Sequence, residues 1–314
     1  MRILWFFTTG TGIATLLAYS GRWSWFCELF VNFRTHYAIA LGLALVAAAG
    51  LRERRIAGIA ALGLALNVWP MTPVYFAATP SAPDARAVRV IAFNVNIGNA
   101  DMARVARYLQ SQSPDVVIVE ELPRENADQL FALLPSLPHR FHAAGMSAGG
   151  LAILSRTRMG NTGIVRRDGL AIAAGADIDL GDRRLRVYGI HLYWPLVPAS
   201  AMFRDAQLRS LARELRECAG ACMAAGDFNT TPWSSHFRDL LTESGFRDCA
   251  RGQGWVPTWP ASLPAPLRIR IDQCLAGQGV GVLKVAVGGS EGSDHLATIN
   301  DLSVAAPMQR KTPP

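Results

Sequence analysis

The sequence predicts a layered α/β fold joined to a separate N-terminal block of apolar helices. From residue 88 onward, short runs rich in Val, Ile and Leu alternate with amphipathic stretches, which is typical of strands and helices packed in layers. Before residue 77, three long runs without any charge dominate the composition. These patterns predict a membrane anchor at 1–76, a linker at 77–87, a folded domain at 88–303 and a disordered tail at 304–314.

The first block has the composition of two or three transmembrane helices. Residues 3–20 and 56–76 contain no charge, and each could cross a hydrocarbon core of about 30 Å at about 1.5 Å per residue. A shorter middle run, "YAIALGLALVAAAGL", is joined to the third run by "RERR", which predicts a tight turn between two helices. The alternative is a cleaved signal peptide ending at "AYS", followed by a buried helical hairpin.

The positions of the arginines predict the orientation of this anchor. Arg2 and the three arginines of "RERR" are expected to stay in the cytoplasm, because positive charge is retained on that side of a membrane. Three crossings then place the rest of the chain outside, in the periplasm or the extracellular space, as part of a multi-pass protein of the inner cell membrane. Membrane lipid is therefore an expected partner of the N-terminal helices.

The folded part of the chain carries little net charge. Of the total of +7, the first 76 residues contribute six arginines and two glutamates, or +4, which leaves +3 for the remainder. A domain at +3 lacks the strong positive field of proteins that bind nucleic acid without specificity.

Short β-branched and aliphatic runs of the second block predict strands. They are "VRVIAFNV", "DVVIVEEL", "LAILS", "AIAAGADIDL", "LRVYGIHL", "CMAAGDFN", "IRIDQCLA" and "VLKVAV". Amphipathic stretches such as "DMARVARYLQSQ" and "ASAMFRDAQLRSLARELREC" predict helices between them. The strands are expected to form two sheets packed together or one sheet covered on both faces.

The cysteines of this block are Cys218, Cys222, Cys249 and Cys274. An oxidising compartment would permit disulfides among them, which the sequence leaves open. Because Cys218 and Cys222 lie four apart on a predicted helix with no second ligand pair, a metal site is not indicated. We interpret these residues as small packing residues.

Polar residues fall at the ends of the predicted strands. Each alone is explained by a turn, a helix start or a strand-edge ion pair. Because the ends of neighbouring strands meet at one edge of a sheet, the whole set predicts a functional site at that edge. The set consists of Asn94, Glu121, His191, Asp227, Asn229, Asp272, Asp294 and His295.

Six short motifs, in their order along the chain, resemble those of a known family. They are "FNVN", "PDVVIVEEL", "GIHL", "GDFN", "RIDQCL" and "GSDHLA". The pattern resembles the metal-dependent endonuclease/exonuclease/phosphatase superfamily, which includes abasic-site endonucleases, pancreatic deoxyribonuclease, neutral sphingomyelinases and inositol-polyphosphate 5-phosphatases. The resemblance implies a four-layer α/β/β/α sandwich that hydrolyses phosphate esters with Mg²⁺ or Mn²⁺ as cofactor.

The resemblance also implies the metal ligands. Hydrolysis of a phosphate ester needs a cation that offsets negative charge, and Mg²⁺ prefers oxygen ligands. Glu121 is the expected ligand, with Asn94 beside it and Asp294 in support of the metal or the histidines. In "VEEL", strand alternation allows only one of Glu120 and Glu121 to face the site, and the family pattern selects Glu121.

The other polar residues receive catalytic roles. His295 is expected to act as the general base or to orient the phosphate, with Asp272 holding its second nitrogen. Asp227 would align the water, and Asn229 would donate to a phosphoryl oxygen. His191 would be the acid or a second phosphate donor.

The sequence does not identify the substrate. It is either a nucleic acid, which would make the protein a nuclease, or a lipid headgroup, which would make it a lipid phosphodiesterase. A domain held outside the cytoplasm would not meet genomic DNA. Trp194, which follows His191, and Arg156 are candidate substrate contacts. The alternative to a membrane-held enzyme is a non-catalytic scaffold on the same fold, and no protein partner is predicted.

Overall fold

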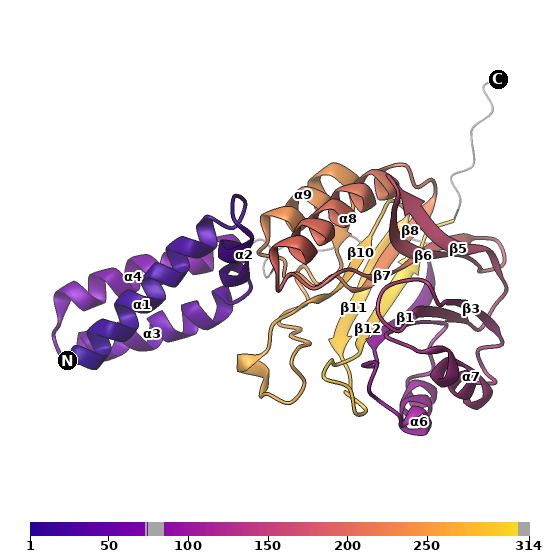
Figure 1. The fold of residues 1–314 in the computed structure, drawn as a ribbon, viewed down its shortest axis with the longest axis horizontal. Coiled ribbons are helices and arrows are strands. Elements are labelled where there is room, and N and C mark those ends of the chain that lie inside the picture. The colour runs from indigo at the N-terminus through magenta and orange to yellow at the C-terminus, as the bar shows by residue number, and fades with distance from the viewer. Residues whose placement is uncertain (73, 75–84, 307–314) are drawn as a thin grey trace, which may run out of the picture.

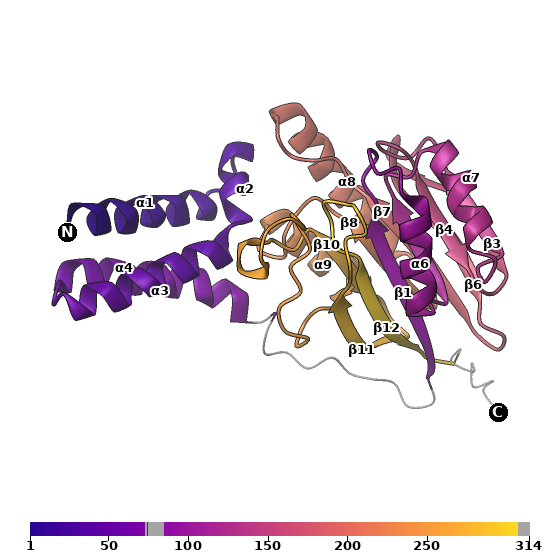
Figure 2. The same cartoon turned by 90° about the horizontal axis from the view of Figure 1, so that it is seen from below.

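The computed structural model describes residues 1–72, 74 and 85–306, so most of the predicted linker and tail lies outside the described residues. An N-terminal helical unit extends from one side of a larger layered domain (Figures 1 and 2). Its elements are α1 (Arg2–Tyr19), α2 (Trp25–Val31), α3 (Arg34–Gly50), α4 (Arg54–Val68) and the short turn η1 (Trp69–Met71).

Three helices of this unit, α1, α3 and α4, pack side by side. Leu41, Ala44 and Ala60 form the small apolar core between α3 and α4. Asn67 crosses to α1, where its Nδ2 donates to Thr15 Oγ1 at 2.8 Å. The turn predicted at "RERR" is confirmed, because α3 ends at Gly50 and α4 begins at Arg54.

The lengths of these helices bear on the predicted membrane crossings. Within the part of the chain that the structure describes, no helix is by itself both long and apolar enough to span a bilayer. Helices α2 and α3 reach that threshold only as a pair, and they are bent by 60° at their junction. Helix α3 has 17 residues and α4 has 15, whereas a straight crossing takes about 20 residues. Membrane anchoring therefore stays a prediction.

The larger domain contains two six-stranded sheets, each of mixed direction. The first has the order β11-β12-β1-β2-β4-β3, and helices α6 (Met102–Gln112) and α7 (Arg124–Leu133) cover its outer face. Its strands are β1 (Arg86–Asn94), β2 (Val116–Glu120), β3 (His139–Ala143), β4 (Leu151–Ser155), β11 (Val280–Val287) and β12 (Thr298–Val304).

The second sheet has the order β5-β6-β7-β8-β10-β9. Helices α8 (Pro198–Arg216) and α9 (Ser235–Ser244) cover its outer face, which completes the predicted four-layer α/β/β/α sandwich. A short turn, η2 (Ala265–Leu267), precedes β10. The strands are β5 (Met159–Arg167), β6 (Leu170–Asp179), β7 (Arg184–His191), β8 (Ala221–Asp227), β9 (Arg247–Asp248) and β10 (Asp272–Ala276).

The central core lies between the inner faces of the two sheets. Ile118 of β2 is fully buried there, within a cluster that draws on strands of both sheets. The sheets approach so closely at β7 that a Cβ on Gly189 would lie 3.0 Å from Ile118 Cγ2 and 2.8 Å from Leu151 Cδ2. Glycine at this position therefore permits the contact between the sheets.

The four cysteines of the larger domain form two disulfides, Cys218–Cys222 and Cys249–Cys274, and the first of these corrects the interpretation of Cys218 and Cys222 as packing residues. Cys218 lies just beyond the end of α8 and Cys222 lies in β8, so the first pair does not share one helix as expected. The Cα atoms of the two pairs are 6.5 and 5.3 Å apart, within the range that a disulfide spans.

The position of Ile118 predicts a large loss of stability on truncation. Ile118→Ala should lower the free energy of unfolding by about 2–5 kcal/mol, because it opens a cavity that the closely packed sheets cannot fill. Denaturant unfolding followed by tryptophan fluorescence measures the loss. Leu283→Ala, on the exposed side of β11, is the matched control and should change the free energy of unfolding by less than about 0.5 kcal/mol. Equal losses in the two variants would contradict the assignment of the core.

Candidate active site

Strand pairing brings the predicted polar residues to one edge of each sheet. In the first sheet, β1 and β2 are parallel and place Asn94 opposite Glu120 at their carboxyl ends. In the second, β7 and β8 are parallel and place His191 opposite Asp227. Strand β10 runs the other way, so Asp272 at its start also lies opposite Asp227.

Asn94 connects the two sheets at this edge. Its Nδ2 donates to Glu121 Oε1 at 3.0 Å and to Asp227 Oδ2 at 3.3 Å, so one amide holds a carboxylate from each sheet. Its Oδ1 accepts the backbone N–H of Asn96 at 3.0 Å. Asn94 and Asp227 are both buried, which keeps this contact out of water.

His295 is held against a carboxylate of β10. Its Nδ1 lies 3.0 Å from Asp272 Oδ2, and its Nε2 lies 3.8 Å from Asp227 Oδ2. Burial by itself would lower the pKa of His295. The carboxylates of Asp272, Asp227 and Asp294 outweigh that effect and raise its pKa to about 10.

His191 faces the same carboxylates from β7. Its Nδ1 hydrogen-bonds Ser147 Oγ at 2.7 Å, and its Nε2 lies 3.6 Å from Glu121 Oε1 and 4.0 Å from Asp227 Oδ2. Burial lowers the pKa of His191 to about 4, although Glu121 opposes that shift. The two imidazoles thus differ in their charge preference while both direct Nε2 toward Asp227.

We call the group formed by Asn94, His191, Asp227, Asp272 and His295 the cluster. Both glutamates of "VEEL" reach it, which corrects the expectation that only one of them would face the site. Strand β2 ends at Glu120, and Glu121 has a φ of 55°, so strand alternation stops between them. Glu121 accepts the backbone N–H of Ile97 at the rim, at 2.9 Å. Glu120 is fully buried below it, and a Cβ on Gly226 would lie 2.6 Å from its Oε1.

The side-chain carboxylate of Glu120 has no hydrogen-bond partner within the described part of the chain. Burial, and after it the charges of Asp272 and Asp227, raise the pKa of Glu120 well above its usual value. For Asp227, burial likewise raises the pKa, to about 7, although His295 opposes the shift. The carboxylates at this site therefore carry more negative charge than the neighbouring groups of the protein neutralise.

This donor set fits a hard divalent cation. One ligand atom each from Asp227, Asp272 and His295 lies within 4.8 Å of the others. Glu121 adds carboxylate oxygens to this set, and Asn94 Nδ2 donates both to Glu121 and to Asp227. Oxygen-rich sets of carboxylates and amides suit Mg²⁺ and Mn²⁺, and a cation would offset the buried negative charge.

Asn229 makes contacts that differ from those expected, whereas Asp294 acts on His295 from the rim. The Nδ2 of Asn229 donates to Asp227 Oδ2 at 3.2 Å and to the backbone oxygen of Leu192 at 2.9 Å, so both of its N–H groups are engaged within the protein. Asp294 lies at the rim, where Asn96 Nδ2 donates to it at 2.7 Å and Trp259 Nε1 donates at 3.0 Å. Asn229 thus orients Asp227, and Asp294 contacts the rim residues.

The two predicted substrate contacts fare differently. Arg156 follows β4 at the edge opposite to the cluster, where its Nη2 donates to the backbone oxygen of Pro114 at 2.8 Å and its Nε lies 3.5 Å from Asp115. The expectation that it meets a phosphate is therefore wrong. Trp194 lies three residues after His191, and 62% of it is exposed.

Sequence reasoning did not assign the residues that support this site. Ser293 Oγ donates to the backbone oxygen of Asn94 at 2.7 Å and accepts the N–H of His295 at 3.0 Å. Ser293 and Asn96 lie inside the quoted motifs, so their neighbours could have suggested them. Ser147 comes from a distant loop and carried no such signal.

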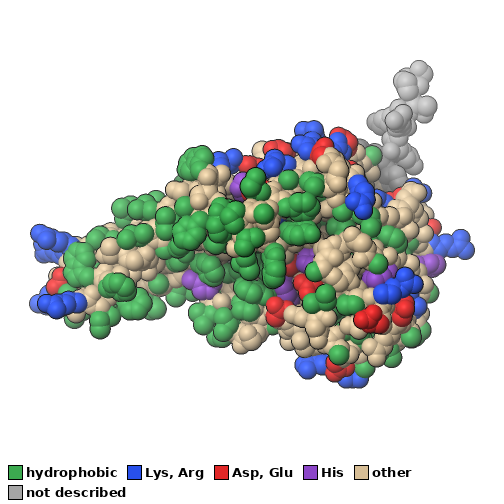
Figure 3. All heavy atoms as spheres, in the orientation of Figure 1, with side chains coloured by type: hydrophobic (Ala, Val, Ile, Leu, Met, Phe, Trp, Pro, Cys, Tyr) green, Lys and Arg blue, Asp and Glu red, His purple; other side chains and the backbone are tan. Residues whose placement is uncertain are grey.

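A hollow of about 490 Å³ lies beside the cluster. It is lined by Asn96, Gly98, Asn99, Ala261, Ser262, Ser290, Gly292, Ser293 and Asp294. As far as the chain is described, this lining contains no Lys or Arg. On the surface, histidine and acidic side chains share a recess near the middle of the face shown in Figure 3.

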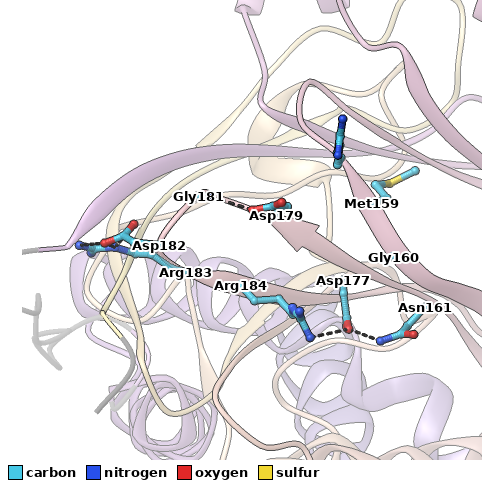
Figure 4. A pocket seen from close by; sticks show the side chains of 10 residues that line it. Met159, Gly160, Asn161, Asp177, Asp179, Gly181, Asp182, Arg183 and Arg184 are labelled. Atoms are coloured by element: carbon cyan, nitrogen blue, oxygen red, sulfur yellow. Dashed lines mark hydrogen bonds and ion pairs between the residues drawn. The ribbon is translucent and has the colours of Figure 1, made fainter. Parts of the chain in front are cut away.

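Another hollow, of about 640 Å³, lies at the opposite edge of the second sheet (Figure 4). Asp177 there accepts from Asn161 at 2.6 Å and from Arg186 at 3.1 Å, so its carboxylate is already satisfied. Arg184, also on this lining, begins β7, whereas His191 ends it. This second hollow is therefore separate from the cluster.

The fold and the cluster together define a class, the α/β/β/α sandwiches with carboxylates and histidines at the joined edges of two sheets. Residues 91–295 match the model of the Endonuclease/Exonuclease/phosphatase family, and the chain belongs to that family. Members of the family are generally hydrolases of phosphate esters. No curated protein matches the chain.

Solved structures share this fold. An endonuclease/exonuclease/phosphatase from Beutenbergia cavernae is 23% identical, with a TM-score of 0.58, over 71% of this chain and 73% of that one. One from Bacteroides vulgatus is 18% identical, with a TM-score of 0.56, over 70% and 99%. TDP2 of D. rerio, complexed with a single-strand DNA product, is 20% identical, with a TM-score of 0.57, over 69% and 98%.

The excess of buried carboxylates predicts stabilisation by a divalent cation. Mg²⁺ or Mn²⁺ at about a hundred times its Kd should stabilise the protein by about 3 kcal/mol, seen as a rise of Tm. Asp227→Ala should remove most of that metal-dependent rise, whatever its own Tm. Asp182→Ala, an exposed carboxylate outside the cluster, should keep it. A rise that survives in Asp227→Ala would place the metal elsewhere.

Proposed function

We propose that this protein is a metal-dependent phosphoesterase that cleaves phosphodiester or phosphomonoester bonds by in-line attack of an activated water. The observation that supports it most is the cluster in which Asn94 joins Glu121 to Asp227 while two imidazoles face the same carboxylate. Phosphoester hydrolysis requires these groups together: oxygen ligands for a cation, a carboxylate for the water and donors for the phosphoryl oxygens.

Glu121 and Asp227 would hold the cation, and Asn94 would keep these two carboxylates together by donating to both. When bound, Mg²⁺ or Mn²⁺ supplies positive charge that stabilises the developing charge on the phosphoryl oxygens. Asp227 lies about equally far from the Nε2 atoms of His191 and His295, at 4.0 and 3.8 Å, which suits a carboxylate that aligns the attacking water between them. Its orientation is set by Asn94 and Asn229 rather than by the substrate.

The two histidines would take the donor and proton-transfer roles. Asp272 holds Nδ1 of His295, so Nε2 is the nitrogen that faces the reacting groups. Ser147 holds Nδ1 of His191 in the same way, which directs its Nε2 toward Glu121 and Asp227. Each imidazole is fixed by one partner before the substrate arrives, so little reorganisation is needed during the reaction.

We also propose that the helical unit holds the enzyme at the inner membrane with its domain outside the cytoplasm. Large apolar side chains are exposed along the unit, among them Phe6, Leu43 and Leu62. Arginines gather at the end far from the domain (Figure 3). Trp23 and Trp69 are exposed at the near end, as suits a membrane interface. The two disulfides fit an oxidising compartment.

A phosphate ester carried by a membrane lipid is the substrate that the surroundings favour. Trp194 and Leu196, which follow His191, are each more than 60% exposed, so apolar side chains form one lip of the site. The adjoining hollow has no cationic lining residue among those described, unlike grooves that track nucleic acid. A nucleic acid is the second candidate, because TDP2 of D. rerio has been solved with a single-strand DNA product.

Hydrolysis of a soluble bis-phosphodiester tests the proposed phosphoesterase activity. The full-length protein should cleave bis(4-nitrophenyl) phosphate only with Mg²⁺ or Mn²⁺. Asp227→Ala and His295→Ala should each lower kcat by at least about a hundredfold, because each removes a group that aligns the water or transfers a proton. His139→Ala, on the edge strand β3, is the control and should keep the wild-type rate. Metal-dependent cleavage at the wild-type rate in both site variants would refute this assignment of the site. No metal-dependent cleavage by the wild-type protein would favour the non-catalytic scaffold.

Vesicle-borne substrates test the apolar lip. Trp194→Ala should lower hydrolysis of phosphodiesters in sphingomyelin or phosphoinositide vesicles by about tenfold, the loss expected for one large apolar contact of about 1.4 kcal/mol. Its rate on the soluble phosphodiester should not change. The control is Leu283→Ala, also exposed and apolar. If wild-type protein cleaves single-stranded DNA and leaves the vesicles intact, nucleic acid is the substrate instead.

A further inference from the structure

The helical unit meets the domain at the segment that follows Asp227. Helix α2 lies against α8 (Figure 1) and beside residues 229–234, which lead from β8 to α9. Trp233 of this segment is buried with Ala18 and Val31 of the unit. The contact is therefore made on the chain that carries Asn229, two residues from the proposed water-aligning carboxylate.

Two polar side chains of the unit bind this segment directly. Asn32 Oδ1 accepts the backbone N–H of Thr231 at 3.3 Å and its hydroxyl at 3.0 Å. Glu28 Oε1 accepts a hydrogen bond from Ser234 Oγ. None of these four residues is more than 9% exposed, so water does not compete for the bonds.

Arg204 extends the contact to Asn229. This arginine of α8 is fully buried, its Nη2 lies 3.8 Å from Glu28 Oε1, and its Nη1 donates to the backbone oxygen of Asn229 at 3.3 Å. Asp205 also pairs with it at 2.7 Å. A buried guanidinium needs partners on all sides, and Glu28 adds a second carboxylate to the one that Asp205 supplies.

Asn229 needs such support because of its backbone conformation. Its φ is 49°, in the left-handed region, which persists only where the surroundings hold it. In this conformation its N–H donates to Asp227 Oδ1 at 2.8 Å and its Nδ2 to Asp227 Oδ2 at 3.2 Å. Any shift of the segment therefore moves the hydrogen bonds that orient Asp227.

We propose that Glu28 and Asn32 are positioning residues of the active site, so that the helical unit holds the Asn229 segment in its working geometry and is not only a tether. The catalytic part of this inference rests on the proposed function. The structural part does not, because it concerns which contacts keep residues 229–234 in place.

Hydrogen–deuterium exchange on the full-length protein tests the structural part. In Glu28→Ala and in Asn32→Ala, amides of residues 229–234 should exchange at least about tenfold faster than in wild type, because their anchoring bonds are lost. Glu28→Gln keeps the side-chain shape and an oxygen for Ser234, which guards against a variant that fails to fold. Wild-type exchange rates in the variants would overturn the proposal, whatever the activity.

Kinetics on bis(4-nitrophenyl) phosphate with Mg²⁺ test the catalytic part. Both alanine variants should lower kcat by at least about tenfold with little change in KM, because displacement of a water-aligning group slows the chemical step. Thr231→Val, which removes only the hydroxyl bond to Asn32, should also lower kcat, and Thr231→Ser, which keeps the hydroxyl, should retain the wild-type kcat. Faster exchange with an unchanged kcat would show a structural contact only and would overturn the catalytic part.

Asp239→Ala is the matched control at the same interface. It removes the ion pair between Arg22 and Asp239, whose atoms are 2.8 Å apart and whose side chains are 51% and 40% exposed. Exchange of residues 229–234 and kcat should both stay at wild-type values. An equal effect of Asp239→Ala and Glu28→Ala would show that docking in general matters and would overturn the specific roles. If wild type has no metal-dependent activity, the proposed function fails and the exchange result alone decides whether the unit holds the segment.

Discussion

The close approach of four carboxylates, three of them buried, beside two imidazoles is the constraint on which the site depends. Glu120, Glu121, Asp227 and Asp272 meet where two sheets join, and only Glu121 keeps appreciable contact with solvent. Like charges at such spacing raise one another's pKa and destabilise the fold unless cations or protons compensate. A rigid sandwich can hold this arrangement because strand pairing, rather than the side chains, fixes the positions.

Much of the layered fold was predictable, since alternating strand and helix patterns determine the layers. Each of the eight predicted strands is present, and both quoted helices are confirmed as α6 and α8. Four strands, β3, β5, β9 and β12, are not among the predicted runs. Strands β3 and β5 lie at sheet edges and carry polar residues and glycines, such as His139, Arg140 and Gly163. Their strand conformation comes from pairing with neighbours, which local composition does not record.

The sequence predicted which residues form the site better than it predicted the contacts between them. Terminal residues of neighbouring parallel strands share an edge, so His191 could be grouped with Asp227, and Asn94 with the end of β2, without a structure. The presence of Glu120 in the site could not be predicted. Its approach to Asp227 depends on the left-handed turn at Glu121 and on the open space at Gly226. The sequence also could not show that both side-chain N–H groups of Asn229 are engaged within the protein, because that depends on the tertiary contacts of a single side chain.

If the helical unit lies in a membrane, as proposed, the interface at α2 also limits how the site faces that membrane. A linker alone would let the domain turn freely, whereas the buried contacts of Glu28 and Asn32 fix the domain relative to the helical unit. With the unit in a bilayer, the same contacts would set one orientation of the recess and of the exposed Trp194 toward the lipid surface. One interface would then do two things: it would hold the Asn229 segment in place and present the site to its substrate. A change at Glu28 therefore separates these effects only when a soluble and a lipid-borne phosphodiester are compared on the same protein.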